Sequence, residues 1–354
     1  MHISEPYKLI ILFSVLILSC FSSELLSMNK KSGGTSRKFI WKIAWSTRPV
    51  KSKDEIKQRI SQAKAIGFNA IALPGIQKRW SDEIVSVGKE KHIEVYYVIF
   101  PHSGVSQKYE PHEYNLLPNS QHGGEPLPED IGKVIDKKPK PFPCFIREEA
   151  VLSAQKDVDF AIKKGYTGIA FDLFGYDNFH GCYCASCNKA RKKYLQEHPG
   201  MDKKEADHRF SEECIIKFYT KVISYAKSIN PEIKTTCHIY PAFLPNILYG
   251  NHLPVDYCGQ TAAWFFKPYW DLNKIKKYSE IIVKNEAAYH SNSIGVAMVG
   301  FYKNVWGETG KSPQRLKNEV ETIKKAGVKG IMISELSSIL SCPEIIQVLK
   351  NELK

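Results

Sequence analysis

The sequence predicts an α/β protein of the (β/α)8 barrel class. Short runs rich in β-branched and aromatic residues alternate with amphipathic stretches over residues 38–354, as in parallel α/β folds. Three expected helices end in a glycine directly before a strand, at Gly67, Gly165 and Gly327, which is typical of helices that lead into parallel strands. The chain has 354 residues, 43% of them hydrophobic. One barrel takes about 250 residues, so we expect a single large domain.

Eight stretches have the composition of strands, the number that closes such a barrel. These strands are Phe39–Trp45, Ala70–Leu73, Ile93–Phe100, Gly168–Asp172, Lys234–Ile239, Tyr257–Ala262, Gly295–Phe301 and Gly330–Ser334. The expected helices are Lys53–Ile66, Asp82–Lys91, Glu148–Lys164, Cys187–Gln196 with Lys203–Ser228, Asp271–Lys284, Pro313–Ala326 and Pro343–Leu353. The fifth unit is the weakest, because residues 241–251 offer only a short helix.

The N-terminal 37 residues are expected to lie outside the barrel. Leu9–Leu18 is apolar-rich and too short to span a bilayer, and it ends in Ile17-Leu18-Ser19-Cys20. This end resembles the signal of bacterial lipoproteins, which implies a signal peptide over residues 1–19 and lipidation of Cys20. Residues 20–37 would then form a flexible tether. An ordinary secretory signal is the close alternative and an uncleaved anchor a third, so we expect an exported protein, either membrane-anchored or secreted.

The formal net charge is +13, which raises the question of a nucleic-acid partner. The lysines are scattered through expected helices, such as Lys51 to Lys64 and Lys311 to Lys325, and do not form one tract. Such a distribution is typical of a solvated surface. We therefore expect no nucleic-acid partner.

Three cysteines within six residues, Cys182-Tyr183-Cys184-Ala185-Ser186-Cys187, follow the fourth expected strand. Thiolates spaced C-x-C-x-x-C converge on one soft cation, and a structural zinc ion takes four ligands. Cys144 is the first candidate for the fourth ligand and His180 the second. Disulfide bonding among these cysteines is the alternative, since exported chains oxidise thiols. Four thiolates leave no open coordination position, so we expect a structural zinc in a knuckle loop over residues 177–190.

A lone cysteine about forty residues upstream, a strand ending in an acidic residue and a C-x-C-x-x-C run that opens a helix resemble the zinc cluster of family-42 β-galactosidases and related TIM-barrel glycoside hydrolases. The similarity covers about Pro143 to Leu195. It implies that Cys144, Cys182, Cys184 and Cys187 are the zinc ligands. Those β-galactosidases close the strand with an Asn-Glu pair whose Glu is the general acid, whereas this chain has Asp172-Leu173. The resemblance therefore extends to the metal site and not to the catalytic acid.

Active sites of such barrels lie at the C-terminal ends of the strands and in the loops that follow. The residues at these positions are Arg48, His102, Asp172, Asp177, His238, Gln260, Trp264, Tyr302 and Glu335. Glycoside hydrolysis needs two carboxylates, one to protonate the leaving oxygen and one to act as nucleophile or base. Asp172 is the first choice and Glu335 its expected partner, with Asp177 and Glu308 as alternatives. His238 would hold substrate hydroxyls or share in proton transfer.

An aromatic segment, Trp264-Phe265-Phe266-Lys267-Pro268-Tyr269-Trp270, follows the sixth expected strand. Aromatic rings suit the apolar faces of sugars, although such rings also simply cover a barrel. We expect Trp264, Tyr302 and Trp306 to bind substrate together with His102 and Gln260.

These features predict an exported glycoside-hydrolase-like barrel that acts on carbohydrate and carries a structural zinc. Two other functions stay open, because one barrel fold supports many chemistries. The first is a barrel that binds glycans without cleaving them. The second is a metal-dependent hydrolase of another substrate, with His102 and His238 as metal ligands.

Overall fold

A computed structural model describes residues 38–100, 102–103, 144–172, 175–176, 182, 184–239, 252–286, 292–304 and 307–354. The expected signal peptide, tether and lipidated Cys20 lie outside these ranges, as do Asp177, His180, Trp306 and the short helix of the fifth unit. His102 is described by its backbone alone. Within the described ranges, none of the helices has the length and apolarity needed to cross a bilayer.

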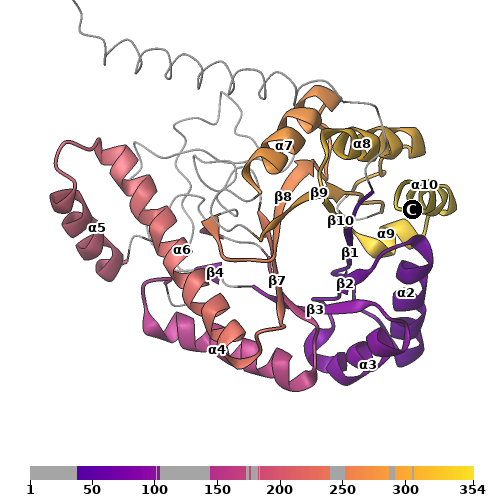
Figure 1. The fold of residues 1–354 in the computed structure, drawn as a ribbon, viewed down its shortest axis with the longest axis horizontal. Coiled ribbons are helices and arrows are strands. Elements are labelled where there is room, and N and C mark those ends of the chain that lie inside the picture. Colours follow the sequence, from indigo (N-terminus) through magenta and orange to yellow (C-terminus); the bar gives the residue numbers. More distant parts are fainter. Residues whose placement is uncertain are drawn as a thin grey trace, which may run out of the picture. The chain divides into compact units, whose positions relative to one another are not determined.

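The described strands form a closed parallel barrel (Figure 1), in the order β1-β10-β9-β8-β7-β5-β3-β2. Every neighbouring pair runs parallel, and β1 closes the barrel against β10 with Trp41 opposite Gly330. The strands are β1 (Trp41–Trp45), β2 (Ala70–Ala72), β3 (Glu94–Ile99), β5 (Gly168–Phe171), β7 (Lys234–Ile239), β8 (Tyr257–Ala263), β9 (Ile294–Gly300) and β10 (Gly330–Ser334). The predicted (β/α)8 fold and its eight strands are confirmed.

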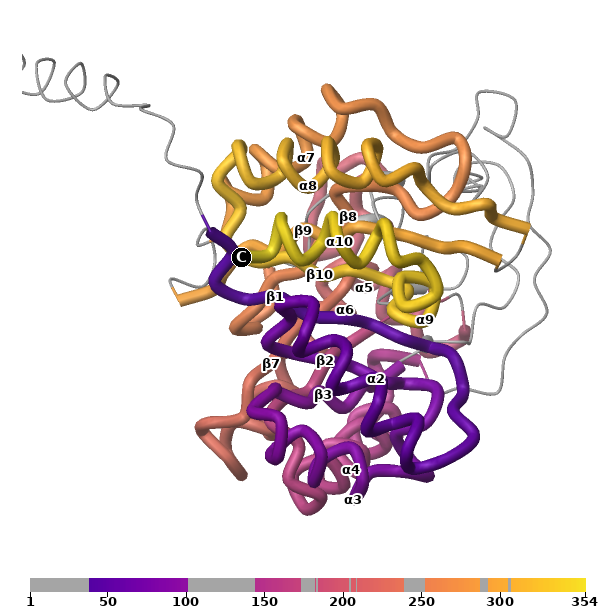
Figure 2. Tube along the Cα trace, turned by 90° about the vertical axis from the view of Figure 1, so that its right-hand side faces the viewer, coloured from indigo at the N-terminus to yellow at the C-terminus, as the bar shows by residue number. Residues whose placement is uncertain are grey.

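Helices surround the barrel, and α8 packs between α7 and α10 on its outer face (Figures 1 and 2). The helices are α2 (Lys53–Ile66), α3 (Gln77–Glu90), α4 (Glu148–Lys164), α5 (Ala185–Glu197), α6 (Lys203–Ile229), α7 (Leu272–Asn285), α8 (Pro313–Ala326), α9 (Leu336–Leu340) and α10 (Pro343–Glu352). Gly67, Gly165 and Gly327 end α2, α4 and α8 with φ of 117°, 82° and 92°. These left-handed conformations suit glycine and confirm the three predicted helix ends.

The N-terminal end of the barrel is closed by side chains from the first residues of several strands. Trp41 stacks on Tyr257 with ring centroids 4.1 Å apart and meets the edge of Tyr96. Glu94 accepts a hydrogen bond from the Trp41 indole and forms an ion pair with Lys234. Residues at this end of a barrel serve stability.

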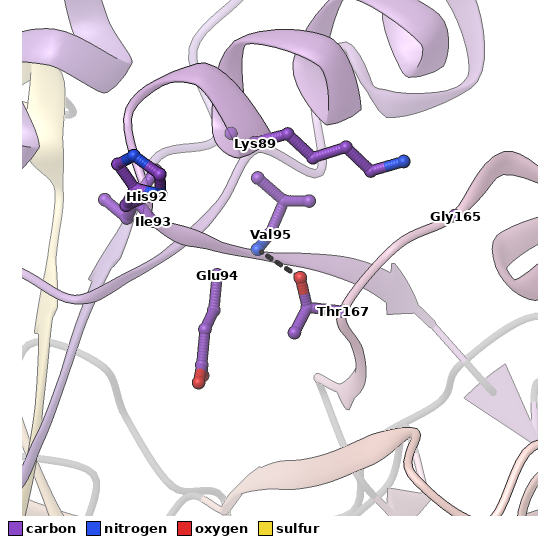
Figure 3. A pocket seen from close by; sticks show the side chains of 8 residues that line it. Lys89, His92, Ile93, Glu94, Val95, Gly165 and Thr167 are labelled. Carbon is purple, nitrogen blue, oxygen red and sulfur yellow. Dashed lines mark hydrogen bonds between the residues drawn. The ribbon is translucent and has the colours of Figure 1, made fainter.

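An open pocket of about 340 Å³ lies at this same end of the barrel (Figure 3). Lys89, His92 and Glu94 line it together with Thr167, whose hydroxyl accepts a hydrogen bond from the Val95 amide. Because Glu94 opens β3 and Thr167 precedes β5, the pocket is remote from the strand ends at which barrel enzymes place their chemistry.

At the opposite end, a second sheet of two short strands extends the barrel. His102–Ser103 (β4) pairs in parallel with Gly175–Tyr176 (β6). Because β4 follows β3 and β6 follows β5, this pairing holds the beginnings of the loops after the third and fourth barrel strands together. No feature of the sequence predicted this sheet.

Candidate functional site

Five polar side chains meet at the C-terminal ends of the barrel strands, and we call them the mouth cluster. They are Asp172, His238, Thr261, Tyr302 and Glu335, and each residue is 9% exposed or less. Asp172 and Tyr302 lie just beyond β5 and β9, Glu335 directly follows β10, and His238 and Thr261 lie within β7 and β8. Four of the five were predicted, and Thr261 was missed. Thr261 could have been predicted from the sequence, because it directly follows Gln260 near the end of an expected strand.

His238 lies on β7 and contacts residues from the two strands that flank β7, namely Asp172 after β5 and Thr261 on β8. Its Nδ1 lies 3.0 Å from Oδ1 of Asp172, and its Nε2 lies 3.2 Å from the hydroxyl oxygen of Thr261. With Nδ1 donating to the carboxylate oxygen of Asp172, Nε2 is left to pair with the Thr261 hydroxyl. The ring of Phe265 stands edge-on to the imidazole at 5.8 Å. The arrangement fixes the imidazole and provides a route for a proton between His238 and Asp172.

Tyr302 lies within electrostatic range of both Asp172 and Glu335. Its hydroxyl lies 2.9 Å from that of Ser334, the residue before Glu335. Burial raises the pKa of the Tyr302 phenol, and the negative charges of Glu335 and Asp172 raise that pKa further. The phenol therefore keeps its proton at physiological pH and can donate a hydrogen bond to an oxygen of a bound molecule.

Glu335 accepts four hydrogen bonds. Oε1 accepts from the Ser46 hydroxyl at 2.5 Å and from the Ser337 amide at 2.9 Å. Oε2 accepts from the amide and the hydroxyl of Thr47 at 2.7 and 2.8 Å. A carboxylate has about four acceptor positions, and all are used here. In this geometry Glu335 links the loop after β1 to the start of α9.

The aromatic segment after β8 packs largely on itself. Trp264 is 3% exposed and stacks on Trp270 at 6.1 Å, while Phe265 lies edge-on to Tyr302 at 5.9 Å. Gly300 makes room for Phe265, because a Cβ at this position would lie 1.9 Å from Cδ1 of the ring. Phe266 and Tyr269 are the more exposed rings of the segment. Most of its aromatic area is therefore buried against neighbouring rings.

The other predicted mouth residues have varied surroundings. Gln260 is 1% exposed and directly precedes Thr261. Arg48 donates to the carbonyl oxygens of Lys303 and Asn304, which ties the loop after β1 to the loop after β9. Glu308 contacts the aromatic segment, with Oε2 3.5 Å from the hydroxyl of Tyr269.

A second site is formed by Cys144, Cys182, Cys184 and Cys187, which we call the cysteine cluster. Their four sulfur atoms lie within 4.8 Å of one another. Sγ of Cys144 is 3.7 Å from Sγ of both Cys184 and Cys187. Sulfurs about 2.3 Å from a tetrahedral metal lie about 3.8 Å apart, whereas disulfide sulfurs lie about 2.05 Å apart. None of the four forms a disulfide, and their separations fit a metal with Cys144 as the fourth member of the set.

Hydrogen-bond donors around Cys144 favour the thiolate form of this residue. The thiols of Cys182 and Cys187 donate to Cys144 and hold the pKa of its thiol well below the usual range, and the Ile146 amide adds to this effect. The same contact with Cys144 raises the pKa of the Cys182 and Cys187 thiols. A bound cation would favour the thiolate form of all four sulfurs.

No protein-family model and no curated protein sequence matches the chain. Among solved structures, the chain is similar to the β-galactosidase from Bacillus circulans sp. alkalophilus, with 13% identity over 85% of this chain and 51% of that one, and a TM-score of 0.51. The β-galactosidase from Halorubrum lacusprofundi gives 8% identity over 89% and 57%, with a TM-score of 0.54. The catalytic domain of β-amylase from Paenibacillus polymyxa gives 11% identity over 89% and 98%, with a TM-score of 0.50.

At these identities the similarity establishes the fold. The predicted resemblance to the barrel of β-galactosidases is confirmed at this level. The chain spans about half the length of the Bacillus β-galactosidase.

Proposed function

We propose that the protein is a carbohydrate-active barrel that cleaves glycosidic bonds at the mouth cluster. The observation that carries the proposal is the buried contact between Asp172 and His238 at the C-terminal end of the barrel. Barrel enzymes place catalytic residues at this end. The similar folds of β-galactosidases and a β-amylase support carbohydrate as the substrate class.

In this proposal Asp172 protonates the leaving oxygen or activates water, as one of the two carboxylates that glycosidases use. His238 orients the Asp172 carboxylate through Nδ1 and exchanges a proton with it. Tyr302 donates its neutral hydroxyl to a sugar oxygen. Glu335 is the proposed second carboxylate, and it must release one of its four hydrogen bonds to react. Trp264, Gln260, His102 and Trp306 remain proposed substrate contacts.

The proposal is tested by screening purified protein against aryl glycosides and polysaccharides. We expect turnover of at least one substrate and its loss when the protein is unfolded beforehand. Binding of a glycan without any cleavage across the panel would instead support the second candidate function.

That second candidate is a barrel that binds glycans without cleaving them. The full use of the acceptor positions of Glu335 favours it, because a carboxylate held by four donors is suited to bracing two loops. A metal-dependent hydrolase with His238 as a ligand is disfavoured, since both ring nitrogens of His238 have partners. In the described ranges, the cysteine cluster is the only group of three or more metal-ligating side chains.

Replacement of Glu335 by Gln separates a reacting role of Glu335 from a bracing role. The amide nitrogen cannot accept, so donors among Ser46, Thr47 and Ser337 lose partners, and we expect the free energy of unfolding to fall by about 1–3 kcal/mol. Turnover is measured at a temperature at which both proteins are folded. Loss of turnover by orders of magnitude identifies a reacting carboxylate, and unchanged turnover identifies a brace. Glu280→Gln, on the exposed face of α7, is the control.

We further propose that the cysteine cluster holds a structural zinc ion. Four thiolates fill its coordination sphere and leave no position for water, so the metal would supply stability to the knuckle and take no part in cleavage. The sulfur separations near 3.7 Å support this choice of geometry.

Finally, we propose that the protein is exported and attached to a membrane through Cys20. The apolar stretch Leu9–Leu18 and the residues that follow it support this location. Replacement of Cys20 by Ser is expected to move the protein from the membrane fraction to the soluble fraction. Unchanged partitioning, with an intact N-terminus found by mass spectrometry, would indicate an uncleaved anchor.

A further inference from the structure

We propose that Arg191 is a positioning residue for the metal of the cysteine cluster, an inference that rests on the metal site proposed above. Arg191 lies on α5, the helix that begins at the cysteine motif. Its side chain is 11% exposed, which is unusual for arginine unless its donors are paired.

The guanidinium reaches back along the chain to a predicted ligand. Nη2 of Arg191 donates to the carbonyl oxygen of Cys182 at 3.0 Å, and Nη1 donates to Oδ1 of Asn188 at 2.9 Å. Cys182 is separated from α5 by Tyr183 and Cys184, and its position decides where its sulfur stands in the cluster. The Arg191 bond therefore fixes Cys182 relative to Cys187, which lies within α5.

Two residues of α6 hold the guanidinium of Arg191 in place. Its Nε forms an ion pair with Asp207, whose side chain is 4% exposed, and its Cζ lies over the ring of Phe210, 5.0 Å from the ring centroid. A planar fork with several fixed donors can satisfy Asp207, Asn188 and the Cys182 carbonyl together. Because the charge of Arg191 is paired with that of Asp207, we expect the effect of the pair on the cluster to be geometric.

This geometry makes Lys an informative replacement. Lys keeps the positive charge but presents one compact donor group, which cannot serve three partners at the places the fork reaches. If Arg191 acted by its charge alone, Arg191→Lys would bind metal as the wild type does. If it positions Cys182, Arg191→Lys and Arg191→Met weaken binding alike.

The experiment titrates reduced, metal-free protein with Co²⁺ alone, followed by the thiolate-to-cobalt absorption, and then displaces Co²⁺ with Zn²⁺. We expect one Co²⁺ per wild-type chain and a loss of affinity of about 10- to 100-fold in both Arg191 variants, the usual cost of removing a group that orients ligands. Arg209→Met is the matched control, because Arg209 is an exposed arginine paired with Glu205 on α6. It should bind as the wild type does.

Thermal unfolding of each variant with and without metal separates positioning from simple packing of α5 on α6. We expect the Arg191 variants to lose more stability in the metal-loaded state than in the metal-free state. Equal losses in both states, affinity within about twofold of wild type, or full rescue by Lys would each overturn the role of Arg191. Absence of Co²⁺ and Zn²⁺ binding by the wild type would instead overturn the metal site itself.

Discussion

Replacement of Asp172 by Asn is expected to lower the turnover of any cleaved glycoside by about 10²- to 10⁴-fold, the usual contribution of a general acid or base. Asn keeps the shape of the side chain, and its carbonyl oxygen still accepts a hydrogen bond from Nδ1 of His238. It cannot release or take up the proton that cleavage requires. The measurement is kcat on the best substrate of the panel, together with thermal unfolding to establish that the fold persists.

The control for this variant is Asp82→Asn, an exposed aspartate paired with Lys164 on the outer helices, which should leave turnover unchanged. The Asp172→Asn protein should also still bind the glycan. Full turnover by Asp172→Asn would exclude Asp172 as acid, base or nucleophile.

Replacement of Cys187 by Ala is expected to give the largest loss of stability among these variants. It removes one of four ligands, so the metal is lost, and structural zinc sites contribute about 10–16 kcal/mol of apparent binding free energy in small peptides. We expect the metal content to fall from one ion per chain to none and the unfolding temperature to drop. A chelator should bring the wild type toward the same unfolding temperature.

Cys214→Ala is the matched control, because Cys214 is a buried free cysteine on α6 outside the cysteine cluster. It should keep its metal and show only the cost of a smaller side chain. Retention of one metal ion and of wild-type stability by Cys187→Ala would contradict a four-cysteine site.

The barrel could be predicted because its signals are local. α2, α4 and α8 match their expected bounds to the residue, since each ends at a glycine and α2 and α8 begin at a serine cap. The start of α3 was placed five residues late, at Asp82, because the helix is kinked at Trp80. The buried Gln77 in its first turn bonds the backbone of Val98 on β3, a contact that no local pattern reveals.

The candidate site was predictable residue by residue but not in its contacts. Asp172 and His238 were both placed at the mouth from their strands, while their contact depends on β5 and β7 being neighbours. Two of the partners of Glu335 are Ser46 and Thr47, which precede it by 289 and 288 residues and reach it only through closure of β1 on β10. The burial of Trp264 likewise follows from rings that pack on one another in space.

The most direct test of the account is a crystal structure of the Asp172→Asn protein with an oligosaccharide from the substrate panel. We expect a sugar at the C-terminal end of the barrel, with a glycosidic or hydroxyl oxygen within hydrogen-bond distance of residue 172 and of Tyr302. A sugar bound elsewhere, with the mouth cluster in contact only with itself, would contradict it.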